Sequence, residues 1–364
     1  MNNEEIHIGI VGAGVVGSTI YSLLASTDWG YKISITDQID KPETISEENY
    51  VKLTVTKPTY DGHCTQFNQF VNGKTLIINA LPYHQNINLY KDCYQLSVPY
   101  FDLSEDDSLD KFIDKLKTAK LSFTMPHCGL APGLSTVIAN DLLNGFENPK
   151  QVRIRVGALS QNATNKLRYY TSWSGDGLVN EYLGDCQVVH NGRLNTVPAL
   201  SGYERITLDG REYEAFHTSG GLGTLAKTLD QKYDYLTVNY KTLRHIGHHD
   251  YVDFLFNDLQ LNQSELTSIF KKIPKTRNDA VILFAAAGNH NYVDERSYYK
   301  VFRPTVISGR YLTAIQYTTA IGLLAMVELF LNKKIPQEGY VKQEDVCMND
   351  VYKTRFGQIY RMDE

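Results

Sequence analysis

The sequence has no surplus of basic residues. Its 364 residues include 36 lysines and arginines against 41 aspartates and glutamates, which gives a formal net charge of -5 at pH 7. A protein that binds nucleic acid needs positive charge to neutralise the phosphate groups. We therefore expect no nucleic acid among the partners of this protein.

Cysteine is scarce and unpaired along the chain. The five cysteines are widely spaced and form no C-x-x-C pair, and the histidines form no H-E-x-x-H motif. Disulfide frameworks and structural zinc sites depend on such patterns. We expect no bound metal and a reducing, cytoplasmic location. The cysteines are Cys64, Cys93, Cys128, Cys186 and Cys347.

Long hydrophobic runs are also missing. The sequence begins MNNEE, without the positive and apolar regions of a signal peptide. The longest apolar stretch, residues 320–331, is shorter than a bilayer-spanning helix and contains Glu328. We expect no membrane span. With 42% hydrophobic residues, a chain of this length predicts roughly two to three folded domains.

The first third of the chain alternates between strand and helix patterns. A β-branched run at residues 6–11 leads through GAGVVG into a helical pattern, and further apolar strands and helices follow to about residue 127. This rhythm predicts an α/β fold with a Rossmann-type, doubly wound parallel sheet over residues 1–127. The expected strands are 29–37, 74–81, 100–103 and 121–125, and the expected helices are 90–96 and 109–116.

The middle of the chain has a different pattern. Polar and apolar residues alternate in short segments separated by glycine, which predicts a second α+β domain with a mixed or antiparallel sheet over residues 128–310. The alternating segments are 151–159, 187–190, 204–208 and 235–240. An apolar helix at 311–331 is expected to pack against the first domain, so that residues 311–364 complete it.

A glycine-rich turn follows the first strand. Gly12, Gly14 and Gly17 form G-x-G-x-x-G between a strand and a helix, with Val15 and Val16 inside the motif. The first glycine permits a tight turn, the second lets a pyrophosphate approach the backbone, and the third lets helix and strand pack closely. The motif predicts a dinucleotide site at the amino terminus of the helix. A turn in a domain that has lost its nucleotide is the alternative.

An acidic residue ends the second strand. Asp37 follows Gly17 by twenty residues, where a carboxylate accepts the ribose hydroxyls of NAD and repels the 2′-phosphate of NADP. Because Gln38 rather than an arginine follows it, we expect NAD as the cofactor. After the next strong strand, Asn79 and Ala80 are expected beside the nicotinamide. The alternative is a plain turn in which Pro82 sets φ and Asn79 satisfies backbone groups.

Residues 125–135, MPHCGLAPGLS, end a strand and open a helix. Pro132 suits the first turn of a helix, and Gly129 and Gly133 allow close approach of the backbone. Cys128 is then expected to face a cleft between the domains. A small buried side chain is the alternative for this cysteine.

Several longer motifs resemble one known family. They are IGIVGAGVVGS, PHCGLAPGLS, YYTSWSGDGLVNEY at 169–182, and the segments at 197–225, 240–250 and 314–346. They resemble the saccharopine dehydrogenase family, which includes NAD-dependent, glutamate-forming enzymes and is similar to lysine 6-dehydrogenases. The resemblance implies oxidative cleavage of saccharopine to glutamate and 2-aminoadipate 6-semialdehyde in lysine degradation.

The resemblance also implies site residues. In relatives, a tyrosine, an acid and a cysteine line the substrate cleft, and Tyr83, Asp102 and Cys128 match them here. We expect Asp102 to hold or relay the proton, while Tyr83 and Cys128 orient the substrate. Fungal relatives carry a basic residue where Tyr170 stands, and the nearest basic residue here is Arg168.

A substrate with several carboxylates needs fixed cations. Arg168, Lys241 and Arg244 are the candidates, although each is also compatible with an ordinary surface charge. Thr218 is a candidate hydrogen-bond donor to a carboxylate, or else part of a plain turn. His248 is a candidate substrate contact.

Three readings of the function remain open. Saccharopine carries more carboxylates than lysine, so the set of cations favours a saccharopine dehydrogenase over a lysine 6-dehydrogenase or another opine-type amine dehydrogenase. A non-catalytic NAD-binding protein is the alternative of a different class. The expected partner is a small amino-acid substrate. The apolar helix and the 25 tyrosines also suit a homodimer.

Overall fold

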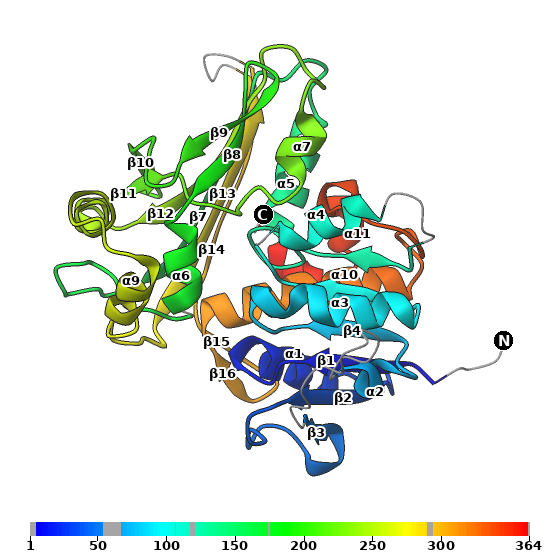
Figure 1. The fold of residues 1–364 in the computed structure, drawn as a ribbon. Helices are drawn as coiled ribbons and strands as arrows, with labels where there is room; N and C mark the ends of the chain where they lie inside the picture. The colour runs from blue at the N-terminus through cyan, green and yellow to red at the C-terminus, as the bar shows by residue number, and fades with distance from the viewer. Residues whose placement is uncertain are drawn as a thin grey trace. The chain divides into compact units, whose positions relative to one another are not determined.

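The computed structural model describes residues 5–53, 67–105, 107–116, 121–173, 175–289 and 294–362, so Cys64 lies outside the described residues. The chain divides into two compact units. Unit 1 comprises Met1–Leu134 and Thr319–Ile359, and unit 2 comprises Ser135–Thr318 and Tyr360–Glu364. Figure 1 shows the elements of both units.

Unit 1 contains a six-stranded sheet with the order β3-β2-β1-β4-β5-β6, and every neighbouring pair is parallel. This confirms the doubly wound sheet that the sequence predicts. Val11 pairs with Asn79, and Asn79 pairs with Asp102, so the carboxyl ends of the three central strands lie at one edge. The strands are β1 (His7–Val11), β2 (Lys32–Asp37), β3 (Tyr50–Lys52), β4 (Leu76–Asn79), β5 (Tyr100–Asp102) and β6 (Thr124–Met125).

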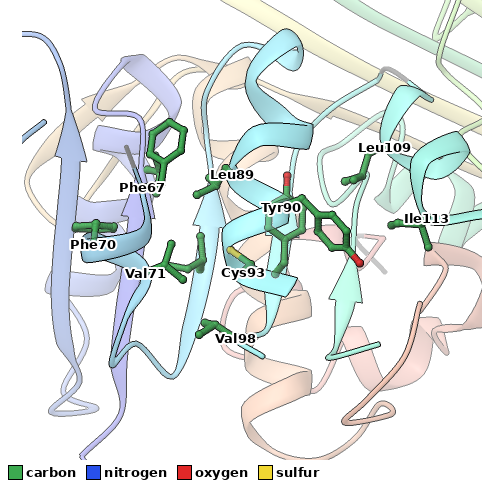
Figure 2. Packing of buried hydrophobic residues seen from close by; sticks show 12 residues of the cluster. Phe67, Phe70, Val71, Leu89, Tyr90, Cys93, Val98, Leu109 and Ile113 are labelled. Atoms are coloured by element: carbon green, nitrogen blue, oxygen red, sulfur yellow. The ribbon is translucent and has the colours of Figure 1, made fainter. Parts of the chain in front are cut away.

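Helices cover both faces of this sheet. Figure 2 shows the cluster in which side chains of α2, α3 and α4 pack together, with Tyr90 of α3 near its centre. Tyr90 lies edge-on to Tyr100, with ring centroids 5.4 Å apart. Phe101, the next residue of β5, points to the other face and contacts Phe330 of α10 at 5.7 Å. The helices are α1 (Val15–Ala25), α2 (Asn68–Val71), α3 (Asn86–Gln95), α4 (Ser108–Lys115) and α10 (Ala314–Leu331).

The long apolar helix expected at 311–331 is confirmed, and it is longer than the apolar stretch 320–331 considered by itself. Helix α10 spans Ala314–Leu331, has a mean hydropathy of 1.6 and is 72% buried. By length and composition it is one helix able to cross a membrane, so the argument that the apolar stretch is too short was wrong. The buried core helix of a folded protein has the same length and composition.

The carboxy-terminal part of unit 1 lies beside the last strand. Ser122 bridges to Glu338, and Thr124 bridges to Tyr340. Short helical segments follow at Gln343–Asp345, α11 (Met348–Val351) and Gly357–Tyr360. Residues more than two hundred positions apart in sequence thus meet at this end of the sheet.

Unit 2 contains a mixed sheet with the order β10-β11-β12-β7-β13-β14, and β8 joins β12 and β9 beside it. Strands β7 and β12 pair in parallel, whereas the other neighbouring pairs of this sheet are antiparallel. This confirms the predicted second domain type. The strands are β7 (Gln151–Ser160), β8 (Asp185–His190), β9 (Arg193–Pro198), β10 (Glu204–Leu208), β11 (Arg211–Phe216), β12 (Thr237–Arg244), β13 (Asp279–Gly288) and β14 (Glu295–Phe302), with a hairpin of β15 (Thr305–Ile307) and β16 (Arg310–Leu312).

Short helices complete unit 2. Asn262 caps α9 through a capping box, accepting from the backbone of Ser264 and Glu265 at 3.0 and 3.1 Å. The helices are α5 (Leu134–Leu143), α6 (Gly175–Glu181), α7 (Leu225–Leu229), α8 (His248–Asp253) and α9 (Gln263–Phe270), and a π-helical turn, Phe254–Asp258, continues α8.

The crossover at residues 125–135 differs in one respect from the expectation. The Ala131–Pro132 peptide bond is cis, and α5 begins at Leu134. Pro132 therefore lies in the turn before the helix rather than in its first turn. Gly133 has a φ of 128°, and a Cβ there would overlap the carbonyl oxygen of Gly129, so the expected close approach of the backbone is present.

Candidate active site

The glycine loop of unit 1 has the geometry of a dinucleotide cradle. Gly12 has a φ of 105°, and a Cβ there would lie 2.7 Å from the carbonyl oxygen of Ala80. A Cβ on Gly17 would overlap the carbonyl oxygen of Gly12. A Cβ on Gly14 would meet no described atom within 4 Å. The first and third glycines are thus required by packing, while the second borders open space that a pyrophosphate fits.

Helix α1 begins at this open space. Gly14 is its N-cap, no described side chain caps it, and its first turn contains no acidic residue. Val15 is 59% exposed and Val16 is half-buried. The positive end of the helix dipole and its backbone N–H groups therefore suit an anionic ligand.

Asp37 is held against the glycine loop. Its Oδ2 accepts a hydrogen bond from the backbone N–H of Ala13 at 2.7 Å. Its Oδ1 accepts from the backbone N–H groups of Gln38 and Ile39 at 2.6 and 3.3 Å. Asp37 is only half-buried, so the carboxylate is oriented by the backbone and still accessible to ribose hydroxyls. The loop and Asp37 together fit a bound nicotinamide dinucleotide.

Asn79 organises the turn after β4. It is buried, its Nδ2 donates to Asn86 Oδ1 and to Tyr100 Oη, each at 2.8 Å, and its Oδ1 accepts from the backbone N–H of Leu81 at 3.0 Å. These bonds agree with the plain-turn alternative for Asn79. The half-buried Ala80 donates its N–H to Val11 at 2.7 Å. A contact of either residue with nicotinamide stays a prediction.

Asp102 ends the neighbouring strand and is 1% exposed. Its Oδ2 accepts from Tyr100 Oη, and its Oδ1 accepts from the backbone N–H groups of Ser104 and His127, all at 3.0 Å. Burial raises the pKa of Asp102, while His127 and the hydrogen bonds act in the opposite direction. Tyr83 is half-buried and lies in the short helix Tyr83–Gln85.

Cys128 lies in the interior of unit 1. It is 1% exposed, its Sγ lies 3.1 Å from the carbonyl oxygen of Met125, and it accepts from Gln343 Nε2 at 3.1 Å. Burial raises the pKa of the thiol well above its usual range. The turn after β6 directs Sγ inward, which agrees with the alternative of a small buried side chain. A role for Cys128 in catalysis stays a prediction.

The sequence-based reasoning did not select His127 and its partners. His127 is 2% exposed, with Nδ1 2.6 Å from the carbonyl oxygen of Ser104 and Nε2 2.9 Å from Asp110 Oδ2. Tyr340 donates to Asp110 Oδ1 at 2.7 Å. Although burial lowers the pKa of His127, Asp110 and Asp102 raise it to about 9. The sequence feature that could have identified His127 as a site residue is its position next to Cys128 in the family motif.

In unit 2, two of the candidate cations lie on opposite faces of the sheet. Lys241 and Arg244 are three residues apart on β12, so their side chains leave opposite faces of the sheet. Lys241 pairs in register with Arg155 of β7. Glu204 bridges them, accepting from Lys241 Nζ at 2.7 Å and from Arg155 Nε at 2.5 Å. The expected set of cations around one substrate was therefore wrong in placing Lys241 with Arg244.

Arg244 is buried in a polar cluster. Its Nε donates to Tyr182 Oη at 2.8 Å, its Nη1 to the carbonyl of Leu243 at 2.9 Å, and its Nη2 to Glu181 Oε2 at 3.3 Å. Burial raises the pKa of Glu181 to about 7, with Arg244 opposing the rise. The sequence did not identify Glu181 and Tyr182 as site residues, because two adjacent residues at the end of a helix form no recognisable motif.

His248 belongs to the same cluster and is fully buried. The carbonyl of Leu167 can only accept, so His248 Nδ1 carries the proton and donates to it at 2.8 Å. The unprotonated Nε2 of the neutral ring then accepts from Tyr182 Oη at 3.0 Å. Burial, with Arg244 nearby, lowers the pKa of His248 to about 3. This histidine is therefore neutral and orients Tyr182.

The remaining candidates differ in exposure. Thr218 is 2% exposed, and its Oγ1 has no hydrogen-bond partner among the described residues. The next residue, Ser219, donates its N–H to the carbonyl of Glu181 at 2.9 Å, which ties this segment to the end of α6. Arg168 is exposed and has a φ of 55°. Within the described ranges, no group of three or more His, Cys, Asp or Glu residues is arranged to hold a metal ion.

Comparisons with known proteins agree with this architecture. A crystal structure of apo saccharopine dehydrogenase (L-Glu forming) from Saccharomyces cerevisiae has a TM-score of 0.70 and 16% identity, over 95% of this chain and 97% of that chain. Homospermidine synthase from Legionella pneumophila, in complex with NAD, has a TM-score of 0.66 and 13% identity, over 99% of this chain and 91% of that chain. At these identities the likeness concerns the fold.

Two family profiles match the sequence. Residues 8–123 match the saccharopine dehydrogenase NADP binding domain, and residues 129–361 match the saccharopine dehydrogenase C-terminal domain. The first match covers the glycine loop and Asp37, and identifies a nicotinamide-dinucleotide-binding domain. The second covers the mixed sheet and the carboxy-terminal segment. This chain belongs to the saccharopine dehydrogenase family.

Proposed function

We propose that this protein is an NAD-dependent dehydrogenase that oxidises the secondary amine of saccharopine and releases glutamate and 2-aminoadipate 6-semialdehyde. The observation that carries the proposal is the arrangement at the edge of the unit 1 sheet. There the glycine loop follows β1, Asp37 ends β2, and the buried Asp102 ends β5. Family membership supports an oxidoreductase.

The electrostatics of Asp37 support NAD over NADP. The carboxylate is fixed beside the loop by Ala13 and Gln38. A 2′-phosphate at this ribose would place negative charge next to a carboxylate, whereas two ribose hydroxyls can donate to it. The name of the matching family profile refers to NADP, so a direct comparison of the two cofactors is part of the test.

Bound NAD supplies a hydride acceptor for the carbon next to the amine nitrogen. In the proposed reaction the ammonium first loses a proton, and Asp102 is proposed to hold that proton, because burial raises the pKa of its carboxyl while three hydrogen bonds fix its position. Water then adds to the imine, and the C–N bond breaks to release the amine product. Tyr83 and Cys128 are proposed to orient the substrate.

Unit 2 is proposed to bind the substrate carboxylates. Arg244, which is bound to Glu181, supplies the cation, and Thr218 supplies a buried hydroxyl next to Ser219, whose N–H donates to the Glu181 carbonyl. Lys241 is not part of this proposal, because its side chain leaves the other face of β12 from Arg244 and is bound to Glu204. His248 holds Tyr182, which in turn fixes Arg244.

One observation favours lysine 6-dehydrogenase as a second candidate. Saccharopine needs more cations than lysine, yet Lys241 and Arg155 are bridged by Glu204, and Arg244 is already bound to Glu181 and Tyr182. Fewer available cations suit the smaller substrate. In that case free L-lysine would lose hydride from the carbon that bears its side-chain amine.

The test is the rate of NADH or NADPH formation by the purified protein with saccharopine and, separately, with L-lysine, each with NAD and with NADP. Turnover with saccharopine and NAD is the expected result. Turnover with L-lysine alone would assign the second candidate. Tight NAD binding without turnover on either amine would contradict both.

A further inference from the structure

We propose that His127 is a positioning residue that holds Asp102 in its ionised, hydrogen-bonded state through a buried pair with Asp110. The inference rests on the proposed function in one respect, which is the role of Asp102 in proton transfer. It concerns residues of unit 1, in the turns after β5 and β6 and in helix α4.

The hydrogen bonds of His127 define its charge. A backbone carbonyl can only accept, so Nδ1 carries a proton toward Ser104, 2.6 Å away. Asp110 accepts from Tyr340 on one oxygen and faces His127 Nε2 with the other at 2.9 Å. With Asp110 ionised, the second oxygen accepts from Nε2, which then also carries a proton, in agreement with the raised pKa of His127. His127 is therefore an imidazolium with an acceptor at each nitrogen.

The same residue shapes the environment of Asp102. The backbone N–H of His127 donates to Asp102 Oδ1, and the backbone N–H of Cys128 donates to the Asp102 carbonyl at 2.8 Å. Ser104 contributes twice, with its N–H on Asp102 Oδ1 and its carbonyl on the His127 ring. His127 has a φ of 61°, an uncommon conformation for a residue other than glycine. The ring contacts thus stabilise the backbone conformation that directs N–H to Asp102.

The pair with Asp110 is anchored by distant parts of the chain. Asp110 lies on α4 and is 6% exposed, while Tyr340 lies in the carboxy-terminal segment that bridges to Thr124 of β6. Removal of water strengthens the attraction between the two charges, and the additional hydrogen bonds satisfy their remaining atoms. The imidazolium is therefore fixed in position on both sides.

The other titratable groups around this cluster are neutral or negatively charged. His127 therefore carries the positive charge that balances Asp102. Burial raises the pKa of Tyr100, Cys128 and Tyr340, so these groups stay neutral. Glu344 faces Tyr340, and Asp110 carries the charge opposite to His127. Because burial favours neutral Asp102, an adjacent cation and donated N–H groups are needed to keep it ionised.

The experiment compares the wild type with Asp110→Asn and His127→Asn in two measurements. The first is an NMR titration of histidine ring carbons, in which the His127→Asn spectrum identifies the His127 signal. We expect a charged His127 at pH 7 in the wild type and a neutral ring in Asp110→Asn. A neutral His127 in the wild type at pH 7 would overturn the proposal, whether or not the protein turns over any substrate.

The second measurement is the pH profile of kcat/KM. Loss of the cation should move the acidic limb upward by about 1 pH unit or more in both variants, with activity recovered at high pH. Asparagine tolerates positive φ and retains the backbone N–H, so His127→Asn removes the charge without removing the donor. Asp107→Asn, at the N-cap of the same helix and bound to Lys111, is the matched control and should keep the wild-type profile. An unshifted limb in Asp110→Asn would overturn the proposal, while a wild type without turnover would count against the proposed function alone.

Discussion

Lys241 and Arg244 leave opposite faces of β12, and each is bound to a different glutamate, Glu204 and Glu181 respectively. The two side chains therefore do not point to one site on the same face of the sheet. Lys241→Met should therefore leave the KM for the amine substrate within about twofold of the wild type, because KM changes when a substrate contact is lost. Steady-state kinetics at saturating NAD measure this, and a roughly tenfold rise in KM would return Lys241 to the substrate site.

The glycine loop predicts opposite effects for two alanine substitutions. Gly17→Ala should destabilise the fold by about 1–3 kcal/mol, because its Cβ would overlap the Gly12 carbonyl. Gly14→Ala should leave the midpoint of thermal unfolding near that of the wild type, since its Cβ meets no described atom within 4 Å. It should nevertheless weaken NAD binding by occupying the space next to the helix terminus. Calorimetry of unfolding and of NAD binding separates the two effects, and normal affinity in Gly14→Ala would argue against a pyrophosphate at this position.

Asp37 should determine the choice of cofactor. Asp37→Ala should weaken NAD binding by about 1.5–3 kcal/mol, the range for hydrogen bonds to a charged group, and weaken NADP binding less. Asp40→Ala, a nearby exposed aspartate bound to Lys52, is the control. Titration of both nucleotides into each variant measures the ratio. An unchanged preference between NAD and NADP would remove Asp37 from the site.

Asp102 should affect turnover far more than cofactor binding. In Asp102→Asn the amide oxygen can replace the acceptor for Ser104 and His127, and the amide nitrogen can donate to Tyr100. The fold should persist, while turnover falls by about a hundredfold or more, the usual contribution of a proton-transferring group. Kinetics and an NAD binding isotherm on the same preparation are sufficient. Unchanged turnover would show that this carboxylate is structural.

Because His248 of unit 2 is buried, we expect the folded protein to lose stability in acid. The pKa of His248 is lowered from 6.5 to about 3 in the folded state. The folded form therefore resists protonation, so stability is complete above pH 6.5 and declines as pH falls toward 3, by about 1.4 kcal/mol per pH unit. His248→Gln should show a shallower decline, and the exposed His190→Gln should match the wild type. Urea unfolding at several pH values tests this, and equal slopes in all three proteins would contradict a neutral buried His248.

The sequence predicted the parts of the site that are contiguous or periodic. The roles of Gly12 and Gly17 follow from a local motif, and the place of Asp37 follows from the length of one helix and one strand. Strand β13 was not predicted, because its sequence DAVILFAAAG is apolar at almost every position and lacks the alternation that marks a half-buried strand.

Other features depend on contacts that no local pattern contains. Tyr340 and Asp110 are 230 positions apart, so their hydrogen bond exists only through the return of the chain to unit 1. The separation of Lys241 from Arg244 depends on which residues of β12 face each side, and the sequence-based estimate ended that strand at residue 240. The inward direction of Cys128 depends on the turn that also places His127.

The most direct test of the account measures glutamate and NADH together, in a reaction of the purified wild-type protein with saccharopine and NAD. The account predicts that both products form in equal amounts, and that Asp102→Asn forms neither at a comparable rate while it still binds NAD. NADH formed without glutamate would contradict cleavage of saccharopine at the glutamate nitrogen, and equal rates in the two proteins would contradict the role given to Asp102.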